Sequence, residues 1–167
     1  MEFNEIRLEE LQFNPFSKIG NEWMLITAGN KEMFNTMTAS WGGVGVLWQE
    51  NVVTTYIRPG RYTKEFVDAN DTFTIAFFNS EYQDALNICG TISGRNEDKV
   101  KKAGLTPYYI DNTVSFQEAS MILVCKKMYQ DTIKPDLFES TENIPKWYPE
   151  KDYHTMYISK ILKVLVN

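Results

Sequence analysis

The spacing of strand-like segments is the sequence feature that most restricts the fold. Runs of β-branched and apolar residues recur along the chain, separated by Gly, Pro or short polar turns. We expect strands over 23–28, 34–48 (with a bend at Gly42-Gly43), 51–58, 72–79, 120–130 and 154–167. Long helices do not alternate with these strands, which disfavours a doubly wound parallel sheet. The pattern predicts a mainly β fold with short helices, as a closed or nearly closed antiparallel barrel that removes exposed strand edges.

Short helices are expected over 63–70, over 80–90 and over 94–104. Thr63 is a candidate N-cap for the first of them. Ser80 and Gln83 match the capping-box pattern, which would open the second helix. Gly104 is a candidate stop for the third.

The polar segment 131–152 is expected to be a long loop. It carries Pro135, Pro145 and Pro149 together with several aromatic residues. A loop of this length in a compact domain is usually functional or partly disordered.

Length and composition fit one soluble domain over residues 1–167. The chain is 43% hydrophobic and 23% charged, and its formal net charge of -5 gives a general nucleic-acid role no electrostatic support. No apolar run approaches the roughly 20 residues that a membrane span needs. The acidic, amphipathic start "MEFNEIRLEE" does not resemble a signal peptide. We therefore expect a cytoplasmic protein that binds neither membranes nor nucleic acid.

Cysteine and histidine usage argues against a metal centre. The two cysteines, Cys89 and Cys125, match no metal-ligand spacing and are expected to be reduced, buried thiols. The chain has one histidine, His154, which excludes zinc sites with several histidines and weakens a Cys-His nucleophile. No metal site is predicted.

The motif "RPGRYT", residues 58–63, could receive a phosphate monoester. Arg58 and Arg61 stand just before the helix that Thr63 would cap. The free N–H groups and partial positive charge of a helix start, together with guanidinium groups, suit a phosphate. The alternative is that both arginines pair with local carboxylates and Thr63 only caps the helix.

The stretch "TASW", residues 38–41, could read the edge of a planar heteroaromatic ring. Thr38, Ala39 and Ser40 are small enough to leave backbone groups accessible, and Trp41 could add an apolar face. A strand that simply ends in a glycine bend is the alternative. Together with the phosphate motif some 20 residues later, the stretch fits the two ends of a mononucleotide cofactor.

Two further stretches are weaker candidates. "CGTISGRNEDK", residues 89–99, could bring hydroxyl groups and cations to the ligand, or could be only a turn with a solvated charged face. His154 in "DYHTMY" could orient a nicotinamide or supply a proton, although a lone histidine at a strand start is most often structural.

These motifs, in their order along the chain, resemble the flavin reductase family. "WMLITAGNKEMFNTMTASWGGVGVLW", "RPGRYTKEFV", "NDTFTIAFF", "ALNICGTISGR" and "YHTMYI" carry the resemblance, which is closest to flavoredoxin-like members and runs from about Asn21 to Ile158. It implies a Greek-key split β-barrel that pairs into a homodimer, with non-covalent FMN near the interface.

The resemblance also implies roles for matched positions. Asn35, Thr38, Ala39, Ser40 and Trp41 would lie along the isoalloxazine ring and ribityl chain of FMN. Arg58, Arg61, Tyr62 and Thr63 would surround the phosphate. Cys89 and Lys99 would approach the flavin, and His154 would contact the nicotinamide or another substrate.

Two positions depart from the family pattern. Ser159-Lys160 stand where many relatives have Gly-Glu, which bears on the end of the last strand. Tyr62 stands where broader flavin reductases often have a small residue, which bears on the phosphate contacts.

The expected activity is that of an FMN-binding oxidoreductase of the flavin reductase type. Electrons would pass from NAD(P)H or a redox partner through FMN to an acceptor, and no side chain need act as a nucleophile. The alternatives are a flavoredoxin-type electron carrier that takes electrons from a protein, and a non-catalytic flavin-binding or redox-sensing module.

Overall fold

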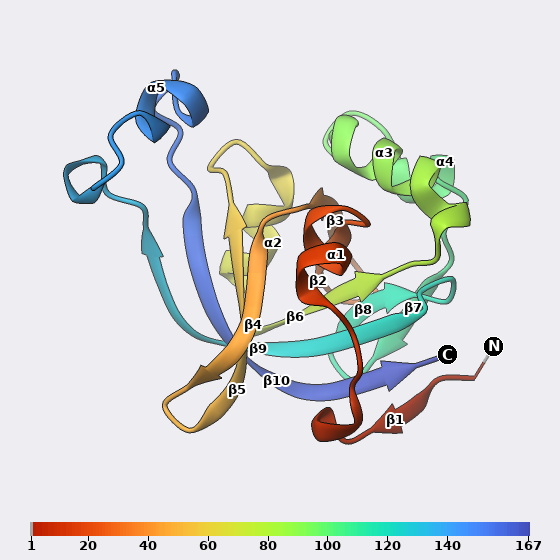
Figure 1. The fold of residues 1–167 in the computed structure, drawn as a ribbon. Coiled ribbons are helices and arrows are strands. Elements are labelled where there is room, and N and C mark those ends of the chain that lie inside the picture. The colour runs from red at the N-terminus through yellow and green to blue at the C-terminus, as the bar shows by residue number, and fades with distance from the viewer. Residues whose placement is uncertain (1) are drawn as a thin grey trace.

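Antiparallel strands dominate the computed structural model, which describes residues 2–167 (Figure 1). The strands are β1 (Asn4–Ile6), β2 (Met24–Gly29), β3 (Phe34–Ala39), β4 (Gly42–Leu47), β5 (Glu50–Ile57), β6 (Thr72–Phe77), β7 (Pro107–Ile110), β8 (Thr113–Phe116), β9 (Met121–Thr132) and β10 (Thr155–Val166). Most of them form one sheet with the order β3-β2-β6-β9-β10-β5-β4, and β1 adds to β10. The β7–β8 pair forms a separate two-stranded sheet. The prediction of a mainly β fold is confirmed.

The large sheet curls around an apolar interior but stays open along one seam. Its order ends at β3 and β4, which Ser40 and Trp41 join in sequence but which do not pair in the described part of the chain. The bend therefore falls at Ser40-Trp41, and the prediction that it falls at Gly42-Gly43 is wrong. Gly42 instead begins β4 beside β5, where a Cβ atom would lie 2.7 Å from the Thr54 carbonyl oxygen. The absence of a side chain allows this close approach of two backbones.

Two apolar clusters explain why several strands are apolar without alternation. Every residue of β2 is buried, because one face of this strand lines the barrel interior and the other lies under α3 and the β7–β8 pair. Ile26 and Phe73 belong to the interior cluster, whereas Leu25 and Ile122 belong to the outer cluster. A sheet that is covered on both faces needs apolar residues at successive positions.

Strand β10 holds the sheet together. It pairs with β5, β9 and β1, and its register with β9 shifts after Ile158 and again after Ile161. Ser159 and Lys160 lie at the first shift, but the strand continues to Val166. The departure from the family pattern at these positions therefore does not end the strand.

Short helices cover the ends and one face of the barrel (Figure 1). They are the 3-10 helices η1 (Leu8–Glu10), η2 (Ser80–Tyr82) and η3 (Pro135–Leu137) and the α-helices α1 (Pro15–Gly20), α2 (Tyr62–Ala69), α3 (Gln83–Thr91), α4 (Lys99–Lys102) and α5 (Asn143–Trp147). None of the helices in residues 2–167 has the length and apolarity of a membrane span. The same residues hold no cluster of three or more His, Cys, Asp or Glu side chains that could bind a metal ion.

The predicted helix starts were partly wrong. Arg61, not Thr63, is the N-cap of α2, and Thr63 lies buried inside the first turn. The capping box of Ser80 and Gln83 does not form, because the Gln83 N–H already donates to the backbone carbonyl of Ser80 in η2. Local backbone bonds have replaced the side-chain cap.

The third predicted helix is much shorter than expected. Asp98 caps α4 through its side chain, which accepts a hydrogen bond from the Lys101 N–H, so the helix starts at Lys99 instead of at residue 94. Gly104 follows the helix with a φ of +69°, as its predicted role as a stop requires. The segment predicted as a loop over 131–152 contains the last residues of β9, η3 and α5.

Both cysteines are buried and free of disulfide bonds, as predicted. Burial, only partly offset by the Lys99 ammonium, raises the pKa of Cys89 to about 11. A thiol with so high a pKa is protonated at neutral pH and is a poor nucleophile.

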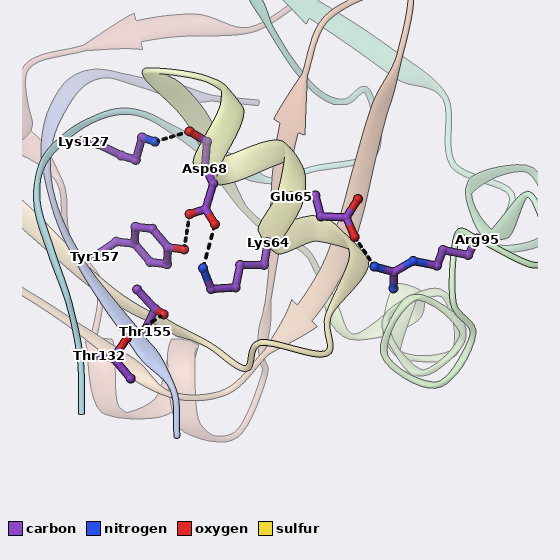
Figure 2. Close-up of polar contacts among 8 residues, drawn as sticks. All are labelled: Lys64, Glu65, Asp68, Arg95, Lys127, Thr132, Thr155 and Tyr157. Atoms are coloured by element: carbon purple, nitrogen blue, oxygen red, sulfur yellow. Dashed lines mark hydrogen bonds and ion pairs between the residues drawn. The ribbon is translucent and has the colours of Figure 1, made fainter. Parts of the chain in front are cut away.

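A polar network joins α2 to β10 and to the turn after α3 (Figure 2). The buried Tyr157 hydroxyl donates to Asp68 Oδ1 at 2.6 Å, and Lys64 Nζ lies 2.6 Å from Asp68 Oδ2. On the other side of the helix, Glu65 pairs with Arg95. Burial acts to raise the pKa of Asp68, but the bonds from Lys64 and Tyr157 outweigh it and lower that pKa. The network fixes the helix on two sides.

We predict that Tyr157→Phe destabilises the fold by about 1.5–3 kcal/mol at pH 7, the range for a lost hydrogen bond to a charged group. Because the pKa of Asp68 is lowered in the folded state, this contribution is complete above the unfolded-state pKa and disappears as the pH falls through the folded-state value. Urea unfolding at pH 7 and at pH 3 measures both effects. Tyr109→Phe, at an exposed position on β7, is the matched control. Equal stability of the two variants at pH 7 would contradict the role of the network.

Candidate functional site

A pocket of about 180 Å³ lies at the open seam of the barrel, where β3, β5, α5 and the start of β10 meet. We call it the seam pocket. Its lining residues are Met37, Thr38, Ala39, Ser40, Trp41, Tyr56, Arg58, Arg61, Trp147 and His154. The structure thus brings residues 38–41 of the first motif and the two arginines of the second, Arg58 and Arg61, to one cavity.

The end of β3 forms one wall of the pocket. The Thr38 hydroxyl donates to the backbone carbonyl of Leu86 at 2.5 Å and so fastens β3 to α3. Ala39 is the last residue of the strand, and Ser40 and Trp41 turn the chain toward β4. At this end β3 has no paired neighbour toward β4 in residues 2–167, so small side chains lie beside the seam.

The two arginines enter the pocket from the end of β5 and from the N-cap of α2. Arg58 forms an ion pair with Asp152 at 2.5 Å and donates to the Trp147 carbonyl at 2.8 Å. Arg61 donates to the Gly90 carbonyl at 2.9 Å. The expected pairing of an arginine with a carboxylate therefore occurs at Arg58, but the partner is distant in sequence and not local.

The hydrogen bond from Arg58 is the main reason that the pKa of Asp152 is lowered. Asp152 therefore stays ionised and holds segment 133–153 against β5. The Arg58–Asp152 pair is partly exposed, so it orients the segment more than it stabilises the fold.

His154 lines the pocket, and its imidazole is uncharged at neutral pH. Burial is the main reason that its pKa falls to about 4, and the Arg58 guanidinium lowers it further. Its Nδ1 atom lies 2.9 Å from the Tyr148 hydroxyl oxygen. At neutral pH the imidazole can donate one hydrogen bond and accept one, but it carries no charge.

Aromatic rings form the outer side of the pocket. The ring centroids of Trp41 and Trp147 are 5.2 Å apart in an edge-to-face contact, and the Trp41 centroid is 5.0 Å from that of His154. Both indoles remain partly exposed. This edge could hold a flat ring through stacking while one face stays accessible.

Asn35 and Thr63 lie together, but away from the seam pocket. Asn35 Nδ2 donates to the Thr63 hydroxyl oxygen at 2.8 Å, and both residues are buried. A Cβ atom on Gly94 would lie 2.1 Å from Asn35 Oδ1, so the turn after α3 approaches β3 only because residue 94 is glycine. The Asn35–Thr63 bond joins β3 to α2, the two elements that carry Ala39 and the N-cap Arg61.

Three other predicted residues also lie outside the seam pocket. Cys89 belongs to the outer apolar cluster. Lys99 donates to the carbonyls of Cys89 and Ile92, each at 3.1 Å, and so caps the end of α3. Tyr62 contacts Phe66 and lies under the Arg95 guanidinium, 4.5 Å from its Cζ.

Sequence reasoning missed Met37, Tyr56 and Trp147 in the pocket and Tyr148 behind it. Tyr56 alternates with the buried Thr55 and Ile57 along β5, and this alternation signals that it lies on the opposite face. Trp147 and Tyr148 belong to the segment predicted as a functional or partly disordered loop. Only the tertiary fold shows that this segment returns to Arg58.

Comparisons with known proteins place the chain in a family. A family model described as a flavin reductase like domain matches residues 16–167. The structure is similar to the flavoredoxin of Desulfovibrio vulgaris, with 25% identity, a TM-score of 0.66 and coverage of 87% of this chain and 69% of that one. It is also similar to an FMN-binding domain of a flavin reductases-like enzyme from Shewanella baltica, with 15% identity, a TM-score of 0.70 and coverage of 99% and 77%.

A third similar structure is an NADH:FAD oxidoreductase from Streptomyces globisporus, with 13% identity, a TM-score of 0.64 and coverage of 87% of this chain and 75% of that one. The comparison with curated proteins gave no match. Because the family match spans most of the chain, and the strand order is that of an open, curled antiparallel sheet, the protein belongs to the flavin reductase like domain family and has its split-barrel fold.

Proposed function

We propose that the protein is an FMN-dependent oxidoreductase that takes electrons from NAD(P)H and passes them to an acceptor. The observation that carries the proposal is the meeting, in the seam pocket, of the small residues 38–40 with Arg58 and Arg61. One group could read the edge of a planar ring, and the other could neutralise a phosphate.

The donor set of the pocket fits FMN. Arg61 is the N-cap of an α2 helix of eight residues, so a guanidinium and the free N–H groups of a helix start lie close together. The residues that would hold the ring are Thr38, Ala39, Ser40 and Trp41, and those that would hold the phosphate are Arg58 and Arg61. Asn35, Tyr62 and Thr63 would position these groups from behind.

The small volume of the pocket suggests that segment 133–153 moves when a ligand binds. At about 180 Å³ it is smaller than the roughly 300–1,000 Å³ of most small-molecule sites. Trp147, on this segment, closes one side, and the segment is fastened to β5 by Arg58. We infer that binding a whole mononucleotide moves this segment outward and exchanges at least one of the Arg58 bonds.

When bound, FMN would supply the electron chemistry: it accepts a hydride and passes electrons on. The protein's residues would bind and orient the reactants. Backbone donors near Ala39 and Ser40 would stabilise negative charge on the ring edge. Trp41 and Trp147 would limit the access of water, and the neutral His154 would contact the nicotinamide or another second substrate.

A flavoredoxin-type electron carrier is the second candidate. It is favoured by the 25% identity to the flavoredoxin of D. vulgaris, the highest among the structures compared above. In that function a protein partner would replace NAD(P)H as the electron donor.

We also propose that the protein is a homodimer. Val46 and Trp48 at the β4–β5 turn are 73% and 57% exposed, and the Trp48 ring lies 6.4 Å from that of the exposed Tyr129. Exposed apolar groups that gather in this way mark interaction surfaces.

We predict that Trp48→Glu converts the dimer into a monomer, because the contact would have to bury the new charge. Sedimentation velocity measures the change. Leu137→Glu, at a comparably exposed apolar position in η3, is the control and should leave the dimer intact. A wild-type protein that sediments as a monomer would refute the proposal.

We predict that Arg61→Ala weakens FMN binding about 10- to 100-fold, the effect of one charge-assisted hydrogen bond of roughly 1.5–3 kcal/mol. Riboflavin lacks the phosphate, so its affinity should hardly change. Fluorescence titration with both ligands measures the difference. Arg7→Ala, which removes an exposed arginine paired with Glu10, is the control. Equal losses for FMN and riboflavin would show that Arg61 does not face the phosphate.

Stopped-flow reduction distinguishes the candidate functions. We predict that NADH or NADPH bleaches the flavin band near roughly 450 nm in the protein loaded with FMN, because bound flavin accepts hydride. Slow bleaching by both nicotinamides but fast exchange with a reduced carrier protein would favour the electron carrier. Bound FMN that neither donor reduces would indicate a non-catalytic flavin-binding module.

A further inference from the structure

Tyr148 and His154 form a buried pair behind the seam pocket. The Tyr148 hydroxyl oxygen lies 2.9 Å from His154 Nδ1, and the two rings meet edge to face with centroids 5.5 Å apart. Both residues are buried. His154 lines the pocket, whereas Tyr148 does not.

The direction of this hydrogen bond follows from the partners that are available. In residues 2–167 the Tyr148 hydroxyl has no acceptor other than His154 Nδ1. A buried hydroxyl proton without an acceptor is costly, so Tyr148 donates and Nδ1 accepts. A neutral imidazole that accepts at Nδ1 carries its proton on Nε2.

The structure holds both partners of the pair in place. The Tyr148 N–H donates to the Ile144 carbonyl at the end of α5, and the His154 carbonyl accepts from the Ile133 N–H at 2.9 Å. The Arg58 guanidinium lies over the Tyr148 ring, 5.2 Å from its centroid. The two backbone bonds fix where the chain carries each residue, and the contact with Arg58 and the packing of His154 against the Trp41 ring hold the two side chains.

We propose that Tyr148 is a positioning residue that fixes His154 as the Nε2–H tautomer, so that the seam pocket offers a neutral N–H donor to a carbonyl or carboxamide oxygen of the second substrate. The substrate part of this proposal rests on the proposed function, whereas the tautomer part does not. The charged groups that face His154 are Arg58, Arg61 and Asp152. Their cations oppose an imidazolium, which is consistent with a neutral donor.

Nitrogen NMR tests the tautomer directly, because His154 is the chain's only histidine. In the full-length protein with labelled histidine at pH 7, we expect a pyridine-type Nδ1 and a pyrrole-type Nε2. Tyr148→Phe should shift the tautomer ratio about fivefold toward Nδ1–H, the effect of one neutral hydrogen bond. Tyr153→Phe is the matched control, because its ring lies 4.8 Å from that of Tyr148 but its hydroxyl does not bind His154.

Hydride transfer gives the second readout. Tyr148→Phe should slow flavin reduction by NAD(P)H about fivefold and leave the Kd for FMN unchanged, and Tyr153→Phe should change neither, since only the first removes the bond to Nδ1. A wild-type protein with its proton on Nδ1, or a Tyr148→Phe variant with wild-type nitrogen shifts, would overturn the proposal. If FMN is not reduced at all, the proposed function fails, but the nitrogen spectra still decide the tautomer. The wild-type spectrum decides it even if the variant does not fold.

Discussion

The pairing of β10 with β5 is the constraint on which the site depends. Its register places Thr155 opposite Ile57, so the residues at the adjoining positions, His154 and Arg58, emerge together at the mouth of the barrel. A shift of one residue would turn the side chains of β10 to the opposite face of the sheet and remove His154 from the pocket. The buried side chain of Tyr157, two residues further along, faces the interior and makes such a shift costly. The core of the barrel therefore sets the geometry of the pocket.

Helix α2 is also held against β10, and this fixes the position of Arg61. Phe66 and Val67 pack into the interior cluster, and Asp68 is bound by Tyr157 of β10. Glu65 ties the other side of the helix to Arg95 (Figure 2). With its body fixed in this way, the helix can present its N-cap, Arg61, to the cavity at a constant position. The Tyr157–Asp68 hydrogen bond and the Glu65–Arg95 ion pair thus both help to fix the start of α2.

The sequence was sufficient for the long strands but not for the short ones or for the side-chain partners. Apolar and β-branched runs identified every long strand, since burial on both faces leaves a strong signal in β2 and β6. Local cap signals were less reliable: Thr63 has the right residue type for an N-cap, but it lies inside the first turn of α2 and its hydroxyl accepts from Asn35 of β3. The β7–β8 hairpin was missed because its Asp111-Asn112 turn lacks the glycine that marks most tight hairpins; Asp111 instead adopts the positive φ of 49° that the turn requires.

In the candidate site, too, the sequence identified the local motifs but not the contacts between distant segments. Residues 38–41 and the two arginines were found because each motif has a chemical meaning by itself. Cys89 and Lys99 belong to a sequence motif but lie outside the pocket: Cys89 is buried near the end of α3, and the Lys99 ammonium reaches from α4 to cap backbone carbonyls there. Tyr148 could not be assigned, since its role depends on a hydrogen bond across a segment that has no periodic pattern. Contacts of this kind are fixed by the tertiary fold alone.

The electrostatics of the pocket differ from those of the chain as a whole. The protein carries a formal net charge of -5, but the seam pocket contains Arg58 and Arg61 with Asp152 as the carboxylate that pairs with Arg58. This local excess of positive charge favours an anionic ligand and contributes to keeping His154 neutral. An anion bound to the arginines would weaken their effect on His154 and raise its pKa, whereas burial, the larger cause, would remain. If the proposed phosphate binds at the two arginines, burial would therefore still keep His154 neutral near pH 7.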